Sequence, residues 1–268
     1  MEQELRALAE QEDPLTFSTA QIEWLLAHIG DPDGAIRDGL VYQLLGRGFF
    51  AGGFSVEQKQ LIAAQATANA GLFAGIGEQR GDLVYTRTFT ALLGQLMLAA
   101  DTQQSFLTAE QVQTWLTWAL RYLHEENDGR GFVPEHGWAH AIAHGSDLLS
   151  AAVAHPAMTF PQLQQALAVV VDVLQRQTAA FLDDDEERLA MVIVGVARNA
   201  HYPRAEVLQF LAATTAQLFA MDNGSDWRSY YRVSAWKRVL QTLYFVAPSL
   251  QASVQPLLVQ YYQRNGFL

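Results

Sequence analysis

Three histidines spaced four residues apart form the densest cluster of chemically reactive side chains in the sequence. They are His136, His140 and His144, and Asp147 follows three residues after the last of them. Four residues advance an α-helix by about 400°, so His140, His144 and Asp147 would share one helix face. Imidazoles at this spacing, together with a carboxylate, could bind a zinc, nickel or iron ion.

Two other interpretations of the histidines remain open. Ala141 follows His140, so the glutamate base of a helical HExxH zinc enzyme is missing. A histidine could act as a metal-free general acid or base near neutral pH, or contact a ligand, with help from Glu135 or Asp128. The structural alternative is that the imidazoles donate hydrogen bonds to carbonyl groups of the Gly-rich, charged loop at 125–137.

Short polar-then-apolar segments recur about every 50 residues along the chain. Their polar members are Arg37, Arg87, His140, Arg188 and Lys237. Each segment is predicted to open the second helix of a helical hairpin, and this period is typical of HEAT-type repeats. Second helices line the concave face of such stacks. We therefore expect these side chains to form a polar ladder on that face.

Helix signals recur throughout the sequence, and strand signals are nearly absent. Ser18, Ser55 and Thr108 each begin a capping box that is followed by apolar residues at helical spacing. We predict an all-α fold, a curved α/α superhelix of about five stacked, HEAT-like helical hairpins that form one domain over residues 1–268. The alternatives are a closed α/α toroid and two unrelated helical bundles.

The predicted working surface is a concave polar groove centred on His140 and His144. Its candidate ligand-binding residues are Arg37, Arg87, Asp128, Arg130, Trp138, His140, His144, Asp147 and Arg188. The two arginines Arg37 and Arg87 have a structural alternative, in which they tie neighbouring units together. Asp128 could likewise contact Arg130 and close a solvated loop.

Other conspicuous residues are expected to be structural. Trp138, Ile142 and Leu149 would lie on the helix face opposite the histidines and pack into the stack. The acidic run at 183–187 is expected to start a helix, where negative charge complements the helix dipole. An aromatic group near the last hairpin is expected to be core, and it comprises Trp227, Tyr230, Tyr231 and Trp236.

Composition limits the partners that we expect. The net charge of −11 and the scattering of only 17 basic residues disfavour nucleic acid. The longest apolar stretch, 166–174, is shorter than the about 20 residues of a membrane span. The absence of cysteine excludes disulfides and thiolate metal sites. The polar N-terminus does not resemble a secretory signal, so we expect a cytoplasmic protein without a membrane partner.

The segments 130–133 and 137–149 resemble an uncharacterised bacterial family, the domain of unknown function number twenty-seven eighty-five. Weaker matches to this family lie at 36–38, 85–89, 186–190 and 243–245, and the resemblance spans roughly residues 15 to 250. It implies a cytoplasmic helical protein and carries no established activity, so it assigns no catalytic residue.

The predicted function is therefore that of a helical-repeat protein that binds a peptide, a partner protein or a small molecule. The alternative is an enzyme that uses His140, His144 and Asp147. Its only expected cofactor would be a divalent metal held by these three side chains.

Overall fold

The computed structural model describes residues 1–222, 224 and 226–268, and these residues are helical except for loops and one short hairpin of strands. The predicted all-α class is therefore confirmed. The chain divides into two compact units, unit 1 (Met1–Ala157) and unit 2 (Met158–Leu268).

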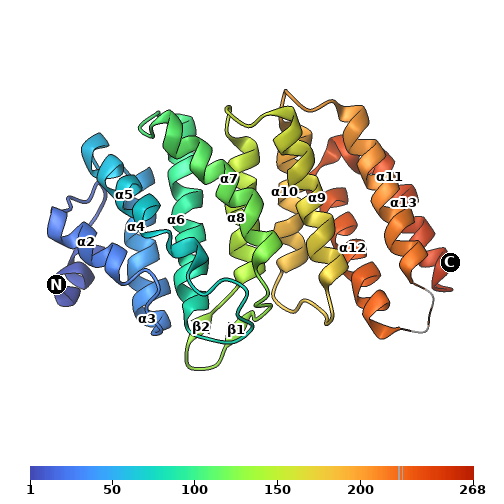
Figure 1. Ribbon diagram of the computed structural model, residues 1–268, viewed down its shortest axis with the longest axis horizontal. Coiled ribbons are helices and arrows are strands. Elements are labelled where there is room, and N and C mark those ends of the chain that lie inside the picture. The colour runs from blue at the N-terminus through green and yellow to red at the C-terminus, as the bar shows by residue number, and fades with distance from the viewer. Residues whose placement is uncertain (223, 225) are drawn as a thin grey trace. The chain divides into compact units, whose positions relative to one another are not determined.

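Unit 1 begins with short helices and continues with longer ones, of which α6 is the longest (Figure 1). They are α1 (Glu2–Ala9), α2 (Thr19–Ala27), α3 (Gly34–Ile36), α4 (Gln43–Phe50), α5 (Val56–Asn69), α6 (Leu83–Gln103), α7 (Ala109–Glu125) and α8 (Ala141–Ala154). A π-helical segment, η1 (Arg37–Tyr42), joins α3 to α4, and a 3-10 turn, η2 (Gly71–Phe73), follows α5. Strands β1 (Phe132–Val133) and β2 (Gly137–Trp138) pair in antiparallel register between α7 and α8.

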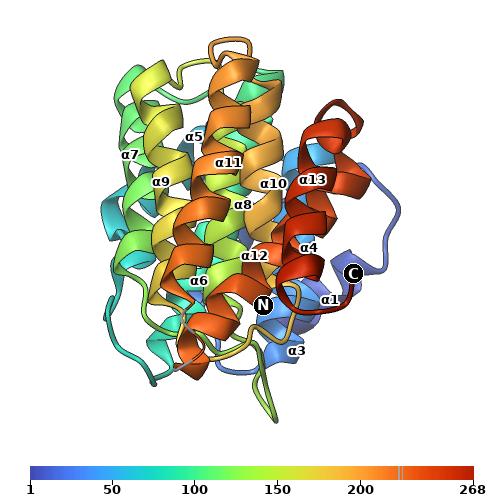
Figure 2. The same cartoon turned by 90° about the vertical axis from the view of Figure 1, so that its right-hand side faces the viewer.

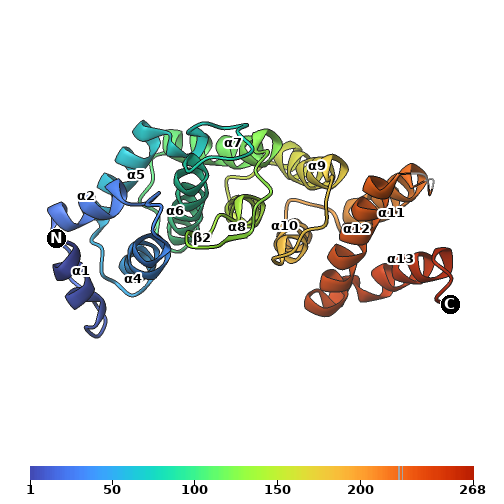
Figure 3. The ribbon, with the colours of Figure 1, turned by 90° about the horizontal axis from the view of Figure 1, so that it is seen from below.

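The helices of unit 1 form two layers. Seen from below, α2, α5 and α7 make one row, and α4, α6 and α8 make the other (Figure 3). Two glycines let the helices approach closely. A Cβ on Gly94 of α6 would lie 2.5 Å from the Trp115 ring, and one on Gly145 of α8 would lie 2.6 Å from Leu123. Side-chain packing of this density fixes how α6, α7 and α8 meet.

Helix starts follow the local signals in the sequence. Ser18, Ser55 and Thr108 each accept a hydrogen bond from the backbone N–H three residues later, and the glutamine at that position bonds back. All three predicted capping boxes are confirmed. Thr159 forms a fourth, which the sequence reading missed.

Unit 2 consists of α-helices and one 3-10 turn, joined by short connections. They are α9 (Phe160–Arg176), α10 (Asp185–Arg198), α11 (Arg204–Met221), α12 (Trp227–Val246), the 3-10 turn η3 (Pro248–Leu250) and α13 (Gln251–Arg264). Helices α9, α10 and α11 run alongside one another, and α10 packs against α12 (Figure 2). The acidic run starts α10 as predicted. Trp236 is core, but Trp227 and Tyr230 are exposed, so the predicted core role is wrong for these two.

Within the part of the chain that the structure describes, no helix is long and apolar enough to cross a membrane.

Candidate functional site

The segment between α7 and α8 carries most of the predicted site residues. Its backbone folds back on itself: Ala139 donates to the carbonyl of Gly131 (2.9 Å), and His140 donates to that of Arg130 (3.0 Å). A small apolar core made by Val84, Tyr85, Ala139 and Ala141 anchors the hairpin to the start of α6. Hydrogen bonds and apolar packing therefore define the conformation of the loop, although it contains no long helix or strand.

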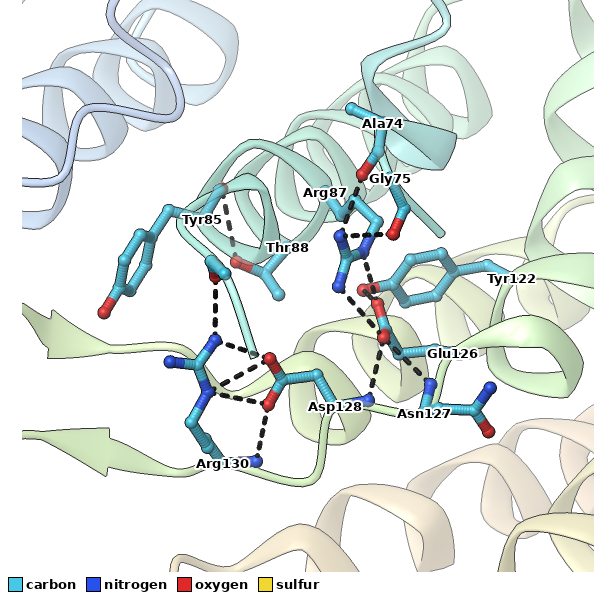
Figure 4. Close-up of polar contacts among 11 residues, drawn as sticks. Ala74, Gly75, Tyr85, Arg87, Thr88, Tyr122, Glu126, Asn127, Asp128 and Arg130 are labelled. Atoms are coloured by element: carbon cyan, nitrogen blue, oxygen red, sulfur yellow. Dashed lines mark hydrogen bonds and ion pairs between the residues drawn. The ribbon is translucent and has the colours of Figure 1, made fainter. Parts of the chain in front are cut away.

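A buried ion pair holds the start of this loop. Arg87 of α6 donates from Nε and Nη2 to the two carboxylate oxygens of Glu126, at 2.6 and 3.1 Å, and both side chains are essentially inaccessible (Figure 4). Glu126 also accepts bonds from the Tyr122 hydroxyl and from the amides of Asn127 and Asp128. Every carboxylate lone pair that faces the interior is thus used, as a buried charge requires.

The electrostatics of the pair follow from its burial. Burial alone would lower the pKa of Arg87, but the bonds to Glu126 outweigh it and the pKa is raised. The pKa of Tyr122 lies well above its ordinary value because the phenol is buried and faces the Glu126 carboxylate. Arg87 therefore stays charged and Tyr122 stays neutral over the physiological pH range.

A second ion pair closes the loop a few residues later. Arg130 contacts the Asp128 carboxylate at 2.6 Å and also donates to the carbonyl of Gly81 at 2.8 Å (Figure 4). The predicted Asp128–Arg130 contact is confirmed. Asp128 and Arg130 therefore stabilise the loop, as the structural alternative to ligand binding predicted for these two residues.

Arg37 fixes the far end of the same loop. Its guanidinium donates to the carbonyls of Asp31 (2.7 Å), His136 (2.7 Å) and Trp138 (3.3 Å), and pairs with Asp38 at 2.7 Å. The side chain is fully buried, 4.2 Å above the ring of Tyr85 and 4.8 Å from that of Phe89. Burial lowers the pKa of Arg37. Burial also raises the pKa of Asp38, and the nearby charges of Arg37 and His144 oppose this increase.

The aromatic and imidazole rings at the end of the loop form a continuous set of contacts. The Trp138 indole stacks on His140 (4.1 Å between centroids, 21° between planes), and His140 meets His144 edge-on at 5.4 Å. His144 Nδ1 lies 3.4 Å from the Asp147 carboxylate. We call Trp138, His140, His144 and Asp147 the His–Trp cluster. It combines a half-exposed indole, two imidazoles and a carboxylate in one place.

The helix predicted for these residues is present and starts beside His140. Helix α8 begins at Ala141, and His140 precedes it in the left-handed backbone conformation (φ 46°). His136 does not extend the helix; it lies in the hairpin turn, where its ring stacks against Tyr85. Trp138 does not pack into the stack, because 37% of its surface is exposed, whereas Ile142 and Leu149 are buried as predicted.

The three predicted metal ligands, His140, His144 and Asp147, lie near one another at the start of α8. Among the described residues, no group of three or more histidine, aspartate or glutamate side chains is placed so that it could hold a metal ion. His140 has a left-handed backbone conformation, and its ring stacks on Trp138 and meets His144 edge-on.

The predicted polar ladder is only partly realised. Arg37 and Arg87 are buried and bonded to the loop, so they are not ligand-facing. Arg188 is exposed on α10 in unit 2. The sequence did not predict Glu126 as the partner of Arg87. No local signal marks Glu126, since Arg87 lies 39 residues away in sequence.

Comparisons with known proteins place the chain in a family. No curated protein and no solved structure matches it. A family model described as "Protein of unknown function (DUF2785)" matches residues 72–245, which cover more than half of the chain and include the whole loop and the His–Trp cluster. The chain belongs to the DUF2785 family.

Proposed function

We propose that this protein binds a ligand at the His–Trp cluster of unit 1, through a planar or cationic group that stacks on Trp138. The observation that carries the proposal is the half-exposed indole stacked on His140, with His144 and Asp147 behind it. Indole faces bind flat or cationic groups, and imidazoles supply hydrogen bonds in both directions. The ligand would be a small molecule or a side chain of a peptide or partner protein.

The construction of the loop supports this proposal. Two buried guanidinium groups hold the loop: Arg37 donates to the His136 carbonyl, and Arg87 pairs with Glu126. Buried ion pairs contribute little net stability, so their value lies in defining one geometry. His140 itself occupies a backbone conformation that non-glycine residues rarely adopt, and such strain concentrates at functional sites.

Affinity selection on the full chain tests the proposal. The protein is incubated with a library of metabolites and short peptides, and the compounds retained after gel filtration are identified by mass spectrometry. Trp138→Ala should lose the retained compounds. Trp227→Ala is the matched control, because it removes an exposed indole from unit 2. Retention of the same compounds by Trp138→Ala, or retention of none by the unmodified chain, would refute the proposal.

A second candidate function, metal-free acid–base catalysis, is favoured by the contact between His144 Nδ1 and Asp147. A carboxylate at this nitrogen orients the imidazole and leaves Nε2 to exchange a proton with a substrate. A compound that is bound and then chemically converted by the unmodified chain, but only bound by His144→Gln, would establish catalysis. Binding without conversion in both would leave the protein a binding protein.

The larger arrangement and the choice of partners also remain proposals. The two-layer packing of hairpins within unit 1 supports the HEAT-like superhelix, and small-angle X-ray scattering would test it for the whole chain. The net charge of −11 supports a partner other than nucleic acid.

A further inference from the structure

A cavity of about 340 Å³ lies in unit 1, among α2, α5, η2 and the first half of α6. This volume is within the range of small-molecule sites. Neither His140 nor His144 lines it, so the cavity is distinct from the His–Trp cluster.

Three polar side chains that line the cavity have no partner inside the protein. They are the hydroxyls of Thr86 and Thr90 and the amide of Asn69. Among the residues that the structure describes, none of these three side chains makes a hydrogen bond, although Thr90 is 96% buried. Thr90 is buried, Thr86 is half-buried and Asn69 is exposed, so their polar groups can bond to a molecule held in the cavity.

The charge around the cavity is negative. Among the described residues that line the cavity, Asp31 alone is charged, and one of its carboxylate oxygens accepts a bond from the Asp33 amide. The last turns of α2 and α5 contribute further lining, and helix C-termini carry partial negative charge. Arg37 donates to the backbone carbonyl of Asp31, and its charge is paired with Asp38 and interacts more weakly with the Asp31 carboxylate.

The rest of the lining is apolar. Leu26, Ile29, Ala66 and Leu93 supply aliphatic surface, and no aromatic side chain takes part. A bound molecule would therefore have a compact aliphatic body. Its polar end must donate hydrogen bonds to a carboxylate and to hydroxyl oxygens.

We propose that this cavity binds a small organic ammonium ion, with the charged nitrogen at Asp31 and the aliphatic body against Ile29 and Leu93. A carboxylate ligand is rejected because no lysine or arginine lines the site. A neutral ligand of the same shape loses the charge-assisted bond to Asp31.

Three probes with one body and different charges test the proposal. Cyclohexylammonium, cyclohexanol and cyclohexanecarboxylate are each titrated into the full chain with labelled Ile and Leu methyl groups. The ammonium probe should shift the methyl signals of Ile29 and Leu93 and bind about tenfold more tightly than cyclohexanol. The carboxylate should cause no shift. Equal binding of all three, or no shift with the ammonium probe, overturns the proposal.

A pair of variants separates a specific contact from general charge. Asp31→Asn keeps the acceptor for the Asp33 amide and should weaken ammonium binding by about tenfold. Asp33→Asn changes the net charge equally, lies outside the lining and still caps α3, so binding should stay within about twofold. Equal weakening by both variants contradicts the assignment. The probe series on the unmodified chain decides the question even if a variant unfolds.

Discussion

At the scale of single residues, the most consequential contact is the buried pair between Arg87 and Glu126. Its desolvation is compensated only while both partners are present, because every oxygen and most of the guanidinium donors are used. An equivalent pair at the surface would be worth far less, since water screens it. The chain offers both kinds of pair at adjacent positions.

Glu126→Gln should lower the free energy of unfolding by about 3–5 kcal/mol, because it leaves the Arg87 guanidinium buried without a counter-charge. Glu125→Gln is the matched control. It breaks the exposed pair with Arg121 and should cost less than about 1 kcal/mol. Urea unfolding of both variants measures the difference, and similar costs for the two would contradict the structural role given to Glu126.

The carboxyl group of Glu186, at the start of α10, predicts a pH dependence of stability. Burial raises its pKa from the ordinary 4.5 to about 7, a shift that the nearby Arg238 opposes, and one carboxyl oxygen has no hydrogen-bond partner among the described residues. The folded chain therefore binds a proton more tightly than the unfolded chain. Stability should fall as pH rises from 4.5 to about 7, by at most about 1.4 kcal/mol per pH unit.

Glu186→Gln removes this titration, so its stability should change less over the same pH interval. Unfolding free energies of the unmodified chain and the variant are compared at several pH values. Two parallel profiles would show that Glu186 does not titrate in this range.

At the scale of elements, the close contacts of α6 with α7 and α8 are sensitive to one added methyl group. Gly94→Ala should destabilise the protein by about 1–3 kcal/mol, because the new Cβ would lie 2.5 Å from Trp115. Gly46→Ala in α4 has nothing within 4 Å of the new carbon and should stabilise the protein by up to about 1 kcal/mol. Thermal unfolding checks both signs. Equal effects would mean that α6 and α8 pack more loosely than described.

Elements that depend on local chemistry were predictable, and the one that depends on distant contacts was not. The capping boxes at Ser18, Ser55 and Thr108 involve residues three apart, so the sequence displays them directly. The hairpin turn that holds His136 was not predicted, because the spacing of the histidines also fits an extension of α8 back to this residue. The actual conformation of the turn depends on Arg37, about a hundred residues away, which binds the carbonyls of His136 and Trp138.

At the scale of the whole molecule, the recurring polar residues marked helix starts better than they marked a ligand surface. His140 directly precedes α8, and Arg87 and Arg188 lie near the starts of α6 and α10, whereas Lys237 lies in the middle of α12. Arg37 and Arg87 became buried anchors because their guanidinium groups match the loop carbonyls and the carboxylate of Glu126. Residue spacing alone contains no information about such partners.

In the candidate site too, local features were predictable from the sequence and contacts between distant residues were not. The sequence singled out the segment from Arg130 to Asp147 as the candidate site, since histidines, a tryptophan and charged residues concentrate there. It did not predict the ring stacking of Trp138 on His140, which follows from the hairpin and the left-handed residue. The central proposal is now specific: we propose that a ligand binds at the His–Trp cluster, on the loop that Arg37 and Arg87 hold in place.

Histidine NMR tests this claim most directly. The chain has seven histidines, so the imidazole signals of a labelled sample can be assigned one by one with histidine variants. Addition of a compound retained in the affinity selection should shift the ring signals of His140 and His144 and leave those of His28 and His201 unchanged. Shifts confined to His28, His124 or His201, with His140 and His144 unaffected, would contradict the account.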